Sequence, residues 1–387
     1  MLAQRPARLA SYADFRQAAR SKLPPFIFDF FDGGAGDEIT LRENEAAFAA
    51  VRLPQRVMVD VSGVAVATQM MNEPMAMPLA LAPVGFAGLL CRRGEVQALR
   101  AAETAQVPFC LSTNSIASVE EVARVARRPF WFQLYMMRDR EVVVDLVRRA
   151  WENGCRTLVF TVDLATTGIR RRDIRHDLFG GNTPAKILSY LSHPQWLVDV
   201  GLRGGPHTFG NLAPYVKAKN LAGFGSWLVQ QFDASVSWQD IAWLREMWKG
   251  KLVIKGILDG RDASMAVDAG ADALVISNHG GRQLDSVLPT ALALPAIAQA
   301  VGRRVPLLVD GGVRSGQDVL KALLLGADAV LIGRAWAYAA AAGGQVAIEA
   351  LLARFHAELR TAMALAGLPH RGAILAARSA GAGTAAP

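Results

Sequence analysis

Gly270-Ala-Asp-Ala-Leu-Val-Ile276 and Gly326-Ala-Asp-Ala-Val-Leu-Ile332 are two copies of one pattern, 56 positions apart. Each copy follows a helical stretch that opens with a Gly-x-Asp sequence, Gly260-Arg-Asp262 in the first and Gly316-Gln-Asp318 in the second. A helix, a tight turn and a short run of Val, Ile and Leu indicate a strand that is buried on both faces of a parallel sheet. The second half of the chain therefore contains successive units of helix and strand.

The same alternation extends over most of the chain. Amphipathic stretches at 95–106, 139–153, 262–269 and 317–325 separate apolar runs that have the residue types of buried strands. Strands that alternate with helices pair in parallel, and eight such units close a (β/α)8 barrel. We therefore predict a single α/β domain over 1–387 with a TIM-barrel fold, and an open doubly wound sheet is the alternative. The eight predicted strands are Met77–Val84, Pro108–Ser112, Phe130–Tyr135, Thr157–Asp163, Lys251–Ile257, Ala273–Ser277, Val305–Asp310 and Ala329–Gly333.

Three segments lie outside this alternation. Residues 1–70 are predicted to form a helical N-terminal preface, broken at Pro24-Pro25 and at a Gly33-Gly34-Ala-Gly36 turn. More than eighty residues separate the fourth and fifth strands, and 176–235 within them form an insertion that mixes aromatic and aliphatic side chains with lysines and arginines. That mixture favours shallow contact with an anionic membrane surface, with a lid on the barrel as the alternative. Residues 376–387 are small and are predicted to form a flexible tail.

Composition places the chain among globular proteins, because 52% of its residues are hydrophobic and 20% are charged. The net charge of +8 is compatible with nucleic acid, a membrane surface or small anions, and the total alone does not choose between them. Cys91, Cys110 and Cys155 form no Cys-x-x-Cys pair, so we expect buried, reduced thiols in a cytoplasmic protein. The N-terminus lacks the apolar core of a signal peptide, and no apolar run reaches the ~18 residues of a spanning helix.

A histidine and an arginine follow the strand at 273–277. His279 and Arg282 flank the Gly280-Gly281 turn, so both sit at the carboxyl end of the strand. Histidine exchanges protons near neutral pH, and the planar guanidinium of arginine matches a carboxylate. The pair on its own is equally compatible with an ordinary surface histidine. Together with the other strand ends, it indicates a base and an anion clamp on one loop.

Polar residues also end the other predicted strands, where TIM barrels assemble their chemistry. The last two strand ends, Asp310-Gly-Gly312 with Arg314 and Gly333-Arg334, are rich in glycine and arginine, and barrels commonly hold a phosphate at this place. Amide and hydroxyl groups on the other strand ends can read the edge of a ring, so a phosphorylated planar cofactor fits better than a sugar phosphate. The other members of the ring are Pro83, Val84, Gly85, Ser112, Gln133, Tyr135, Thr161, Asp163, Lys255 and Ser277.

Ser277-Asn-His-Gly-Gly-Arg-Gln-Leu-Asp285 resembles the active-site signature of the FMN-dependent α-hydroxy acid dehydrogenases and oxidases. The similarity extends over nearly the whole chain, from Lys22-Leu-Pro-Pro25 through Phe132-Gln-Leu-Tyr135 and Phe160-Thr-Val-Asp163 to Asp310-Gly-Gly-Val-Arg314. Within that family, the insertion sequences at 192–196 and 199–202 look most like the membrane-associated bacterial L-lactate dehydrogenases. The resemblance implies FMN as cofactor and oxidation of an L-2-hydroxy acid, with L-lactate as the expected substrate and a quinone or another respiratory carrier as electron acceptor.

The resemblance also implies roles for the strand-end residues. His279 would be the catalytic base, oriented by Asp163, and Tyr135 would bond the substrate hydroxyl. Arg282 and Arg170 would hold the substrate carboxylate. The residues implied to bind FMN are Ser112, Gln133 and Thr161 at the isoalloxazine, Lys255 at its N1/O2 edge, Asp310, Arg314, Gly333 and Arg334 at the ribityl phosphate, and in addition Pro83, Val84, Gly85, Ser277, Gly311 and Gly312.

One position departs from the family pattern, because Phe30 stands where most members have a tyrosine that bonds the substrate carboxylate. The departure leaves open (S)-mandelate or a longer 2-hydroxy acid as substrate. From other classes, a flavin-free barrel isomerase or lyase and a non-catalytic membrane-attached binder also remain open. We expect a peripheral protein on the cytoplasmic face of the inner membrane, held by 176–235, without a metal ion or a nucleic-acid partner. The resemblance implies a homo-oligomer, a tetramer.

Overall fold

The centre of the molecule is a barrel of parallel strands. A computed structural model describes residues 9–176, 181, 183–217 and 221–381. Eight strands form one sheet in the order β3-β10-β9-β8-β7-β6-β5-β4, and a parallel bridge between Leu81 and Phe109 brings β4 back beside β3. Each strand lies within one of the eight predicted runs, so the TIM-barrel prediction is confirmed. The strands are β3 (Leu79–Leu81), β4 (Cys110–Ser112), β5 (Trp131–Tyr135), β6 (Thr157–Thr161), β7 (Lys251–Ile257), β8 (Ala273–Ile276), β9 (Leu307–Val309) and β10 (Ala329–Ile332).

A two-stranded hairpin packs against the apolar inside of the barrel. Its strands are β1 (Thr68–Met70) and β2 (Glu73–Met75), and Met70 and Met75 join the buried cluster formed by inward-facing strand residues. The carboxylate of Glu73 accepts a hydrogen bond of 2.9 Å from the indole N–H of Trp131, the first residue of β5. The hairpin therefore covers the amino-terminal end of the barrel and leaves the chemistry to the carboxyl end.

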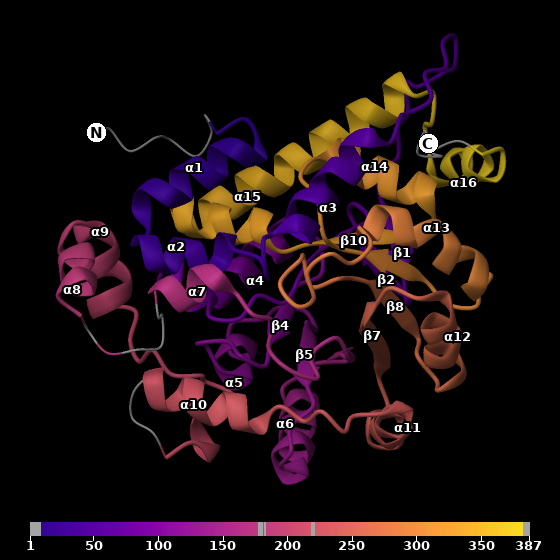
Figure 1. Cartoon of the computed structure of the whole chain (residues 1–387). Helices are drawn as coiled ribbons and strands as arrows, with labels where there is room; N and C mark the ends of the chain where they lie inside the picture. The colour runs from indigo at the N-terminus through magenta and orange to yellow at the C-terminus, as the bar shows by residue number, and fades with distance from the viewer. Residues whose placement is uncertain (1–8, 177–180, 182, 218–220, 382–387) are drawn as a thin grey trace.

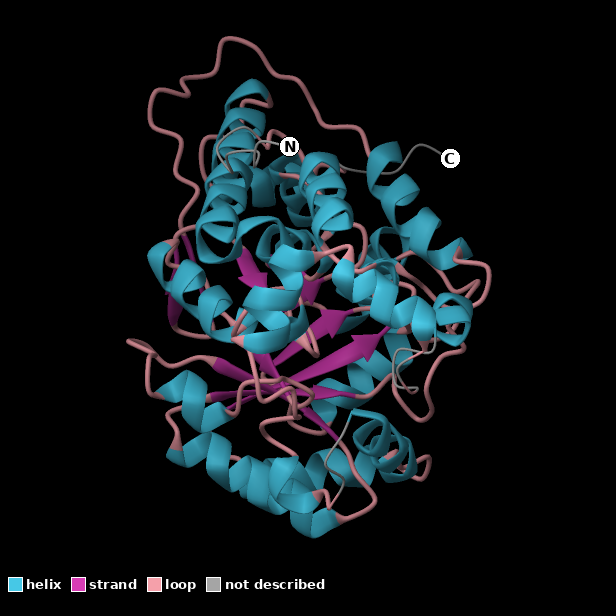
Figure 2. Cartoon of the chain, turned by 90° about the vertical axis from the view of Figure 1, so that its left-hand side faces the viewer, coloured by secondary structure: helices cyan, strands magenta, loops and turns pink. Residues whose placement is uncertain are grey.

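Helices surround the strands (Figure 2). The four predicted amphipathic helices are confirmed to within two residues at each end. α6 illustrates why they form: Val142, Val143, Leu146, Val147 and Ala150 recur at helical spacing on one buried face, and the Asp139 side chain caps the first turn. The helices around the barrel are α4 (Gly94–Thr104), α5 (Val119–Ala123), α6 (Arg140–Glu152), α11 (Trp238–Met247), α12 (Gly260–Asp268), α13 (Thr290–Val301), α14 (Gly316–Leu325) and α15 (Arg334–Leu365), which is kinked at Gly343 and Gly344.

The preface contains α1 (Tyr12–Lys22), α2 (Pro25–Asp32) and α3 (Ile39–Ala50). The predicted breaks are confirmed, because α1 ends before Pro24-Pro25 and the glycines of 33–36 form the turn between α2 and α3. A proline at the first position of α2 costs no hydrogen bond, since the first-turn N–H groups have no partner inside a helix.

Asp32 joins this preface to the rest of the molecule. Its buried carboxylate accepts hydrogen bonds from Arg16 at 2.6 and 2.8 Å, from the Tyr338 hydroxyl at 2.6 Å and from Arg172 at 2.7 Å. Arg172 belongs to α7 (Arg171–His176), and Tyr338 lies on α15. Burial alone would raise the pKa of Asp32, but Arg16 and its other donors lower it from 3.8 to about 2. One carboxylate thus holds α1, α2, α7 and α15 together.

Asp32→Asn is expected to destabilise the protein by about 2 kcal/mol at neutral pH, the free energy that corresponds to this pKa depression. A depressed pKa contributes stability that is present above 3.8 and lost as the pH falls through about 2. Thermal denaturation of both proteins between neutral and acidic pH measures the effect. The melting temperatures should converge toward pH 2, and parallel pH profiles would contradict this role for Asp32.

The insertion is partly a surface lobe and partly core. Figure 1 shows α8 (Pro184–Leu191) and α9 (Pro194–Trp196) as a lobe at the edge of the molecule, and η3 (Leu197–Leu202) continues α9. The later part, with η4 (Ala213–Tyr215) and α10 (Leu221–Gln231), returns to the barrel, where Phe209, Leu212 and Leu228 are buried. Residues 177–180, 182 and 218–220 of the insertion lie outside the described residues.

Three further findings concern the C-terminal end, the cysteines and the membrane. The predicted flexible tail from Ala376 is wrong at its start, because 376–379 form the last part of α16 (Arg371–Ser379), where Ile374 is buried in the core. Residues 382–387 lie outside the described residues. All three cysteines are buried, as predicted. None of the helices in the described ranges combines the length and the apolar character needed to cross a bilayer.

Candidate active site

A cavity of about 720 Å³ opens at the carboxyl end of the barrel. It brings together residues from the preface, the strand ends and the insertion, which are far apart in the sequence. Of the residues predicted for the site, those that line the cavity are Phe30, Pro83, Val84, Gly85, Tyr135, Thr161, Arg170, Lys255, His279, Arg282, Asp310, Gly311, Arg314, Gly333 and Arg334. Three further predicted residues bond residues of this lining: Ser112 bonds Asn114, Asp163 bonds His279 and Ser277 bonds Lys255. Gln133 in turn bonds Ser112.

His279 and Asp163 form a hydrogen-bonded pair, with 2.9 Å between Nδ1 and Oδ1. The His279 backbone has a φ of 56°, and its N–H donates to the Ser277 hydroxyl at 3.0 Å, which fixes the direction of the ring. Burial lowers the pKa of the imidazole below its usual value, although Asp163 opposes this effect. Burial raises the pKa of Asp163, but His279 and Lys255 outweigh it and leave the carboxyl ionised. A neutral imidazole that donates through Nδ1 has Nε2 free to accept a proton.

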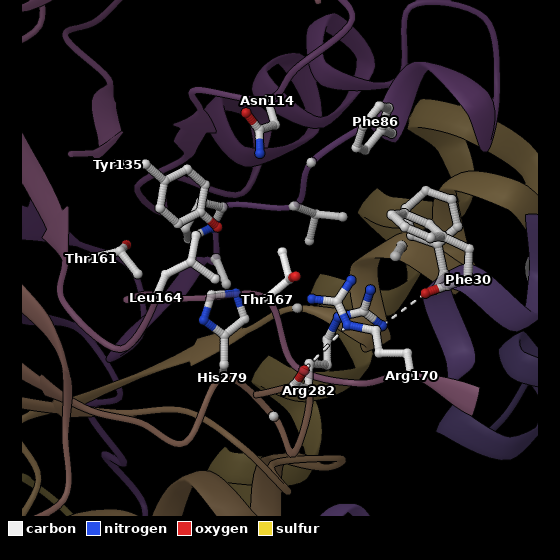
Figure 3. Close-up of a pocket in the computed structure, with 18 of the residues that line it drawn as sticks. Phe30, Phe86, Asn114, Tyr135, Thr161, Leu164, Thr167, Arg170, His279 and Arg282 are labelled. Carbon is white, nitrogen blue, oxygen red and sulfur yellow. Dashed lines mark hydrogen bonds between the residues drawn. The ribbon is translucent and has the colours of Figure 1, made fainter. Parts of the chain in front are cut away.

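Two partly buried arginines lie beside the imidazole, and Figure 3 shows His279, Arg170 and Arg282 around one space. Arg282 donates to the carbonyls of Phe30 and Gly33, both at 2.8 Å, and Arg170 donates to the carbonyl of Arg282 at 3.2 Å. Burial and the neighbouring charges of Arg170 and Arg334 hold the pKa of Arg282 well below its usual value. An anion that binds among these cations reduces their mutual repulsion, so its binding is favourable.

Tyr135 and Phe30 face the same space (Figure 3). Burial raises the pKa of Tyr135 to about 12, so its hydroxyl stays protonated and can donate or accept a hydrogen bond. Phe30 contacts Phe31 and Phe86 edge to face, with ring centroids 5.1 and 5.5 Å away. The Arg282 guanidinium lies 5.2 Å from the centre of the Phe30 ring. This side of the cavity is therefore apolar and aromatic.

The deepest part of the site has polar groups on strand ends. Lys255 is 4% exposed, donates to the Ser277 hydroxyl at 2.8 Å and pairs with Asp310 at 3.1 Å. Burial lowers the pKa of Lys255, but Asp310 and Asp163 raise it above its usual value, so the amine is charged. Several buried polar atoms at these strand ends find no partner within the described part of the chain: Asn114 Oδ1, Gln133 Nε2, Thr161 Oγ1, Asp163 Oδ2 and Asp310 Oδ1.

These unsatisfied atoms test whether a flavin fits. Buried polar atoms are nearly always hydrogen-bonded, so donors and acceptors left over on adjacent strand ends indicate a bound polar group. An amide nitrogen, a hydroxyl and a cationic amine are what the edge of an isoalloxazine ring requires. The strand-end residues therefore fit FMN, and the cavity volume suits a ligand of that size.

The residues predicted to bind the phosphate already have partners within the protein. Arg334 donates to the carbonyls of Phe31, Gly280 and Gly33, and Arg314 bonds Glu45 at 3.0 Å while it stacks over Tyr12. Gly312 has a φ of 100°, and a Cβ there would lie 2.2 Å from the Asn44 carbonyl of α3. Close contact with α3 therefore accounts for glycine at this position, without any phosphate, and Gly312 is not among the residues that line the cavity.

Several lining residues were not predicted from the sequence. Phe86 and Asn114 follow β3 and β4, and Leu164 and Thr167 follow β6. From the insertion, α10 contributes Gly225, Ser226, Leu228, Val229 and Gln230, followed by Phe232. The position of Asn114, two residues after a strand end, was a usable signal. The contact of α10 with the cavity could not be predicted from the sequence, because it depends on how the insertion folds back onto the barrel.

Residues 19–378 match the family model described as FMN-dependent dehydrogenase. The chain belongs to this family. It is 50% identical to the L-lactate dehydrogenase of Allorhizobium ampelinum over 361 residues, which cover 93% of this chain and 95% of the relative. It is 52% identical to the L-lactate dehydrogenase of Caulobacter vibrioides over 362 residues, which cover 93% and 94%.

Solved structures agree with this membership. The monotopic membrane protein (S)-mandelate dehydrogenase superposes with a TM-score of 0.89 at 35% identity, over 94% of this chain and 97% of the other. Mandelate oxidase superposes with a TM-score of 0.81 at 39% identity, over 94% and 96%. The protein is an FMN-dependent oxidoreductase of 2-hydroxy acids. The flavin-free isomerase or lyase and the non-catalytic binder are thereby set aside.

Proposed function

We propose that this protein oxidises L-lactate to pyruvate, with a quinone or another respiratory carrier as the final electron acceptor. The observation that supports an acid–base oxidation most directly is the His279–Asp163 hydrogen bond beside two partly buried arginines and Tyr135. The substrate preference is supported by relatives named L-lactate dehydrogenase at 50–52% identity, against 35–39% for the mandelate enzymes of known structure.

Each side chain has a defined task in this proposal. Arg282 and Arg170 bind the substrate carboxylate, and Tyr135 bonds the hydroxyl that becomes the carbonyl. His279 accepts a proton at Nε2, and Asp163 stabilises the resulting imidazolium through Nδ1–H. The same base serves whether the α-hydrogen leaves as a proton or as a hydride.

FMN supplies the two-electron acceptor for this oxidation when it is bound. Ser112, Gln133, Thr161 and Lys255 would hold its ring, with Pro83, Val84, Gly85 and Ser277 beside them, and Asp310, Gly311, Arg314, Gly333 and Arg334 would lie toward its phosphate. Lys255 would hold a positive charge beside the ring, where a positive charge favours the uptake of electrons.

A panel of substrates tests the proposal. L-lactate, D-lactate and (S)-mandelate are added without oxygen to the FMN-loaded protein, and bleaching of the flavin absorbance is followed. L-lactate is expected to bleach it fastest and D-lactate not at all. A soluble quinone analogue should then restore the colour faster than oxygen does. No bleaching with any 2-hydroxy acid would overturn the proposal.

A second candidate is the oxidation of (S)-mandelate or of another bulky 2-hydroxy acid. The aromatic contacts of Phe30 with Phe31 and Phe86 favour it, because they give the cavity an apolar wall against which a larger side chain can pack. The faster substrate in the same panel decides between the two candidates.

Phe30→Tyr is expected to lower KM for L-lactate by roughly ten- to a hundredfold with little change in kcat. A hydrogen bond to a charged group is worth about 1.5–3 kcal/mol, and a tyrosine at position 30 restores a donor for the carboxylate. Steady-state kinetics with L-lactate and (S)-mandelate measure the effect. If KM for lactate is unchanged and turnover of the larger substrate falls, the lactate assignment is wrong.

We also propose that the surface lobe of the insertion holds the protein on the cytoplasmic face of the inner membrane. Ile187, Leu188, Leu191 and Leu202 are 48–74% exposed on one short stretch of chain, and such residues can enter a bilayer shallowly without spanning it. The (S)-mandelate dehydrogenase of similar structure is a monotopic membrane protein.

The double variant Leu188→Glu, Leu191→Glu is expected to abolish sedimentation with anionic lipid vesicles, because two charges cannot enter the hydrocarbon. Leu365→Glu is the matched control, since Leu365 is 65% exposed on α15, outside the insertion. Equal vesicle binding of the wild type, the double variant and the control would contradict a membrane role for the lobe.

Light scattering coupled to size-exclusion chromatography tests the further expectation that the protein is a tetramer.

A further inference from the structure

One asparagine anchors the later part of the insertion in the barrel. Asn211 is fully buried, and its Oδ1 accepts a hydrogen bond of 2.7 Å from the N–H of Val119, the first residue of α5. Its Nδ2 points the other way and donates to the carbonyls of Ser112 at 3.1 Å and Thr113 at 3.3 Å, and to the Ser115 hydroxyl at 2.9 Å. All four contacts lie between the end of β4 and the start of α5.

The end of β4 is tied in turn to the end of β5. The Ser112 hydroxyl donates to Gln133 Oε1 at 3.1 Å, which sets the amide so that Nε2 is the atom without a partner in the described structure. The Thr113 hydroxyl donates to the Gln133 carbonyl at 2.6 Å and accepts from the Tyr135 N–H at 3.3 Å. The backbone that Asn211 holds therefore sets the directions of Ser112, Gln133 and Tyr135.

We propose that Asn211 is a positioning residue for the flavin site, through which the insertion fixes the strand ends that face the cofactor. A residue that only capped α5 would need an acceptor toward Val119 and nothing more. The Nδ2 group instead donates to the carbonyls of Ser112, the last residue of β4, and of Thr113, which follows it, and to the Ser115 hydroxyl. The inference rests on the assignment of Ser112 and Gln133 to the flavin in the proposed function.

The chemistry of the amide supplies a sharp variant. Asn211→Asp keeps the size of the side chain and the acceptor for Val119, but it turns the donor into a second oxygen against the carbonyls of Ser112 and Thr113. Both carbonyls then lose this donor and meet a negative charge, and the Ser112 carbonyl keeps only the Ser115 N–H at 3.2 Å, so the end of β4 has to move. Asn211→Ala removes both functions.

A matched control lies four residues away on the same segment. The Tyr215 hydroxyl bonds Asp145 and accepts from Arg149 at 3.3 Å, and Arg149 also donates to the Asn211 carbonyl at 2.8 Å. Tyr215→Phe therefore loosens the insertion from α6 without touching the end of β4.

The test uses the FMN-loaded full chain of each variant. FMN affinity is measured from the rise in free-flavin fluorescence on dilution, the environment of the ring from the visible absorption bands, and stability from the melting temperature at saturating FMN. Asn211→Asp and Asn211→Ala are expected to weaken FMN binding about tenfold or more, which corresponds to one lost hydrogen bond of a buried group, and to shift the flavin bands. Tyr215→Phe should change neither.

The outcomes distinguish the proposed role of Asn211 from the assignment of Gln133 to the flavin. If the Asn211 variants melt earlier but keep wild-type FMN affinity and absorption bands, or if neither folds, the residue serves the fold alone and the inference is overturned. Gln133→Leu is measured in parallel. If it leaves FMN affinity and spectrum unchanged, the assignment of Gln133 to the flavin fails, whatever the Asn211 variants do.

Discussion

His279→Gln is expected to retain FMN and to reduce the flavin about 10²–10⁴-fold more slowly, the usual contribution of a positioned acid–base group. Glutamine fills most of the volume of the imidazole and can still donate toward Asp163, but it cannot accept a proton. Asp163 would then remain a partly buried carboxylate near Lys255, so the cofactor end of the site keeps its charges.

Stopped-flow mixing with L-lactate in the absence of oxygen measures the rate of flavin reduction directly. Because burial places the pKa of His279 below its usual value, wild-type kcat/KM should fall only on the acidic side, as the base becomes protonated. The slow variant should lack this acidic limb. A variant that bleaches at the wild-type rate would remove His279 from the role of base.

Arg282→Lys is expected to lower kcat/KM by about a hundredfold, although the charge is conserved. Losing one of two charge-assisted hydrogen bonds costs about 1.5–3 kcal/mol, because an ammonium cannot present the two parallel N–H groups of a guanidinium. The substitution also removes the bonds to the carbonyls of Phe30 and Gly33, which now fix the direction of the side chain.

Arg171→Lys is the control for this experiment. Arg171 is half exposed, pairs with Asp37 at the surface and does not line the cavity, so the same chemical change there should be silent. Steady-state kinetics with L-lactate compare the two variants. Wild-type kcat/KM in Arg282→Lys would show that a point charge suffices for the carboxylate.

The barrel could be predicted from the sequence because the signals for each of its strands lie within the strand and the turn before it. The Gly-Ala-Asp turns and the apolar runs after them specify β8 and β10 without reference to any other part of the chain. For the same reason His279, Arg282 and Lys255 could be placed in one ring, since in a parallel barrel every strand ends on the same side.

What the sequence could not provide depends on contacts between distant segments. Phe86 belongs to the cavity only because the rings of Phe30 and Phe209 pack against it, from the preface and from the insertion. Residues 376–379 have a composition typical of a tail, yet they are helical because Ile374 one turn earlier has a place in the core. Gly312 shows the opposite case, in which a motif residue is explained by packing.

The carboxyl end of α2 has a further effect on how tightly a substrate can bind. Arg282 and Arg334 donate there to the carbonyls of Phe30, Phe31 and Gly33, where the helix dipole places partial negative charge. Both bonds of Arg282 leave from Nη1, so its Nη2 and Nε have no hydrogen-bond partner within the described residues and remain available to a carboxylate. A substrate carboxylate can therefore bind the guanidinium without breaking its bonds to the end of α2. Because this helix end already holds the guanidinium in place, little side-chain entropy is lost when the substrate binds.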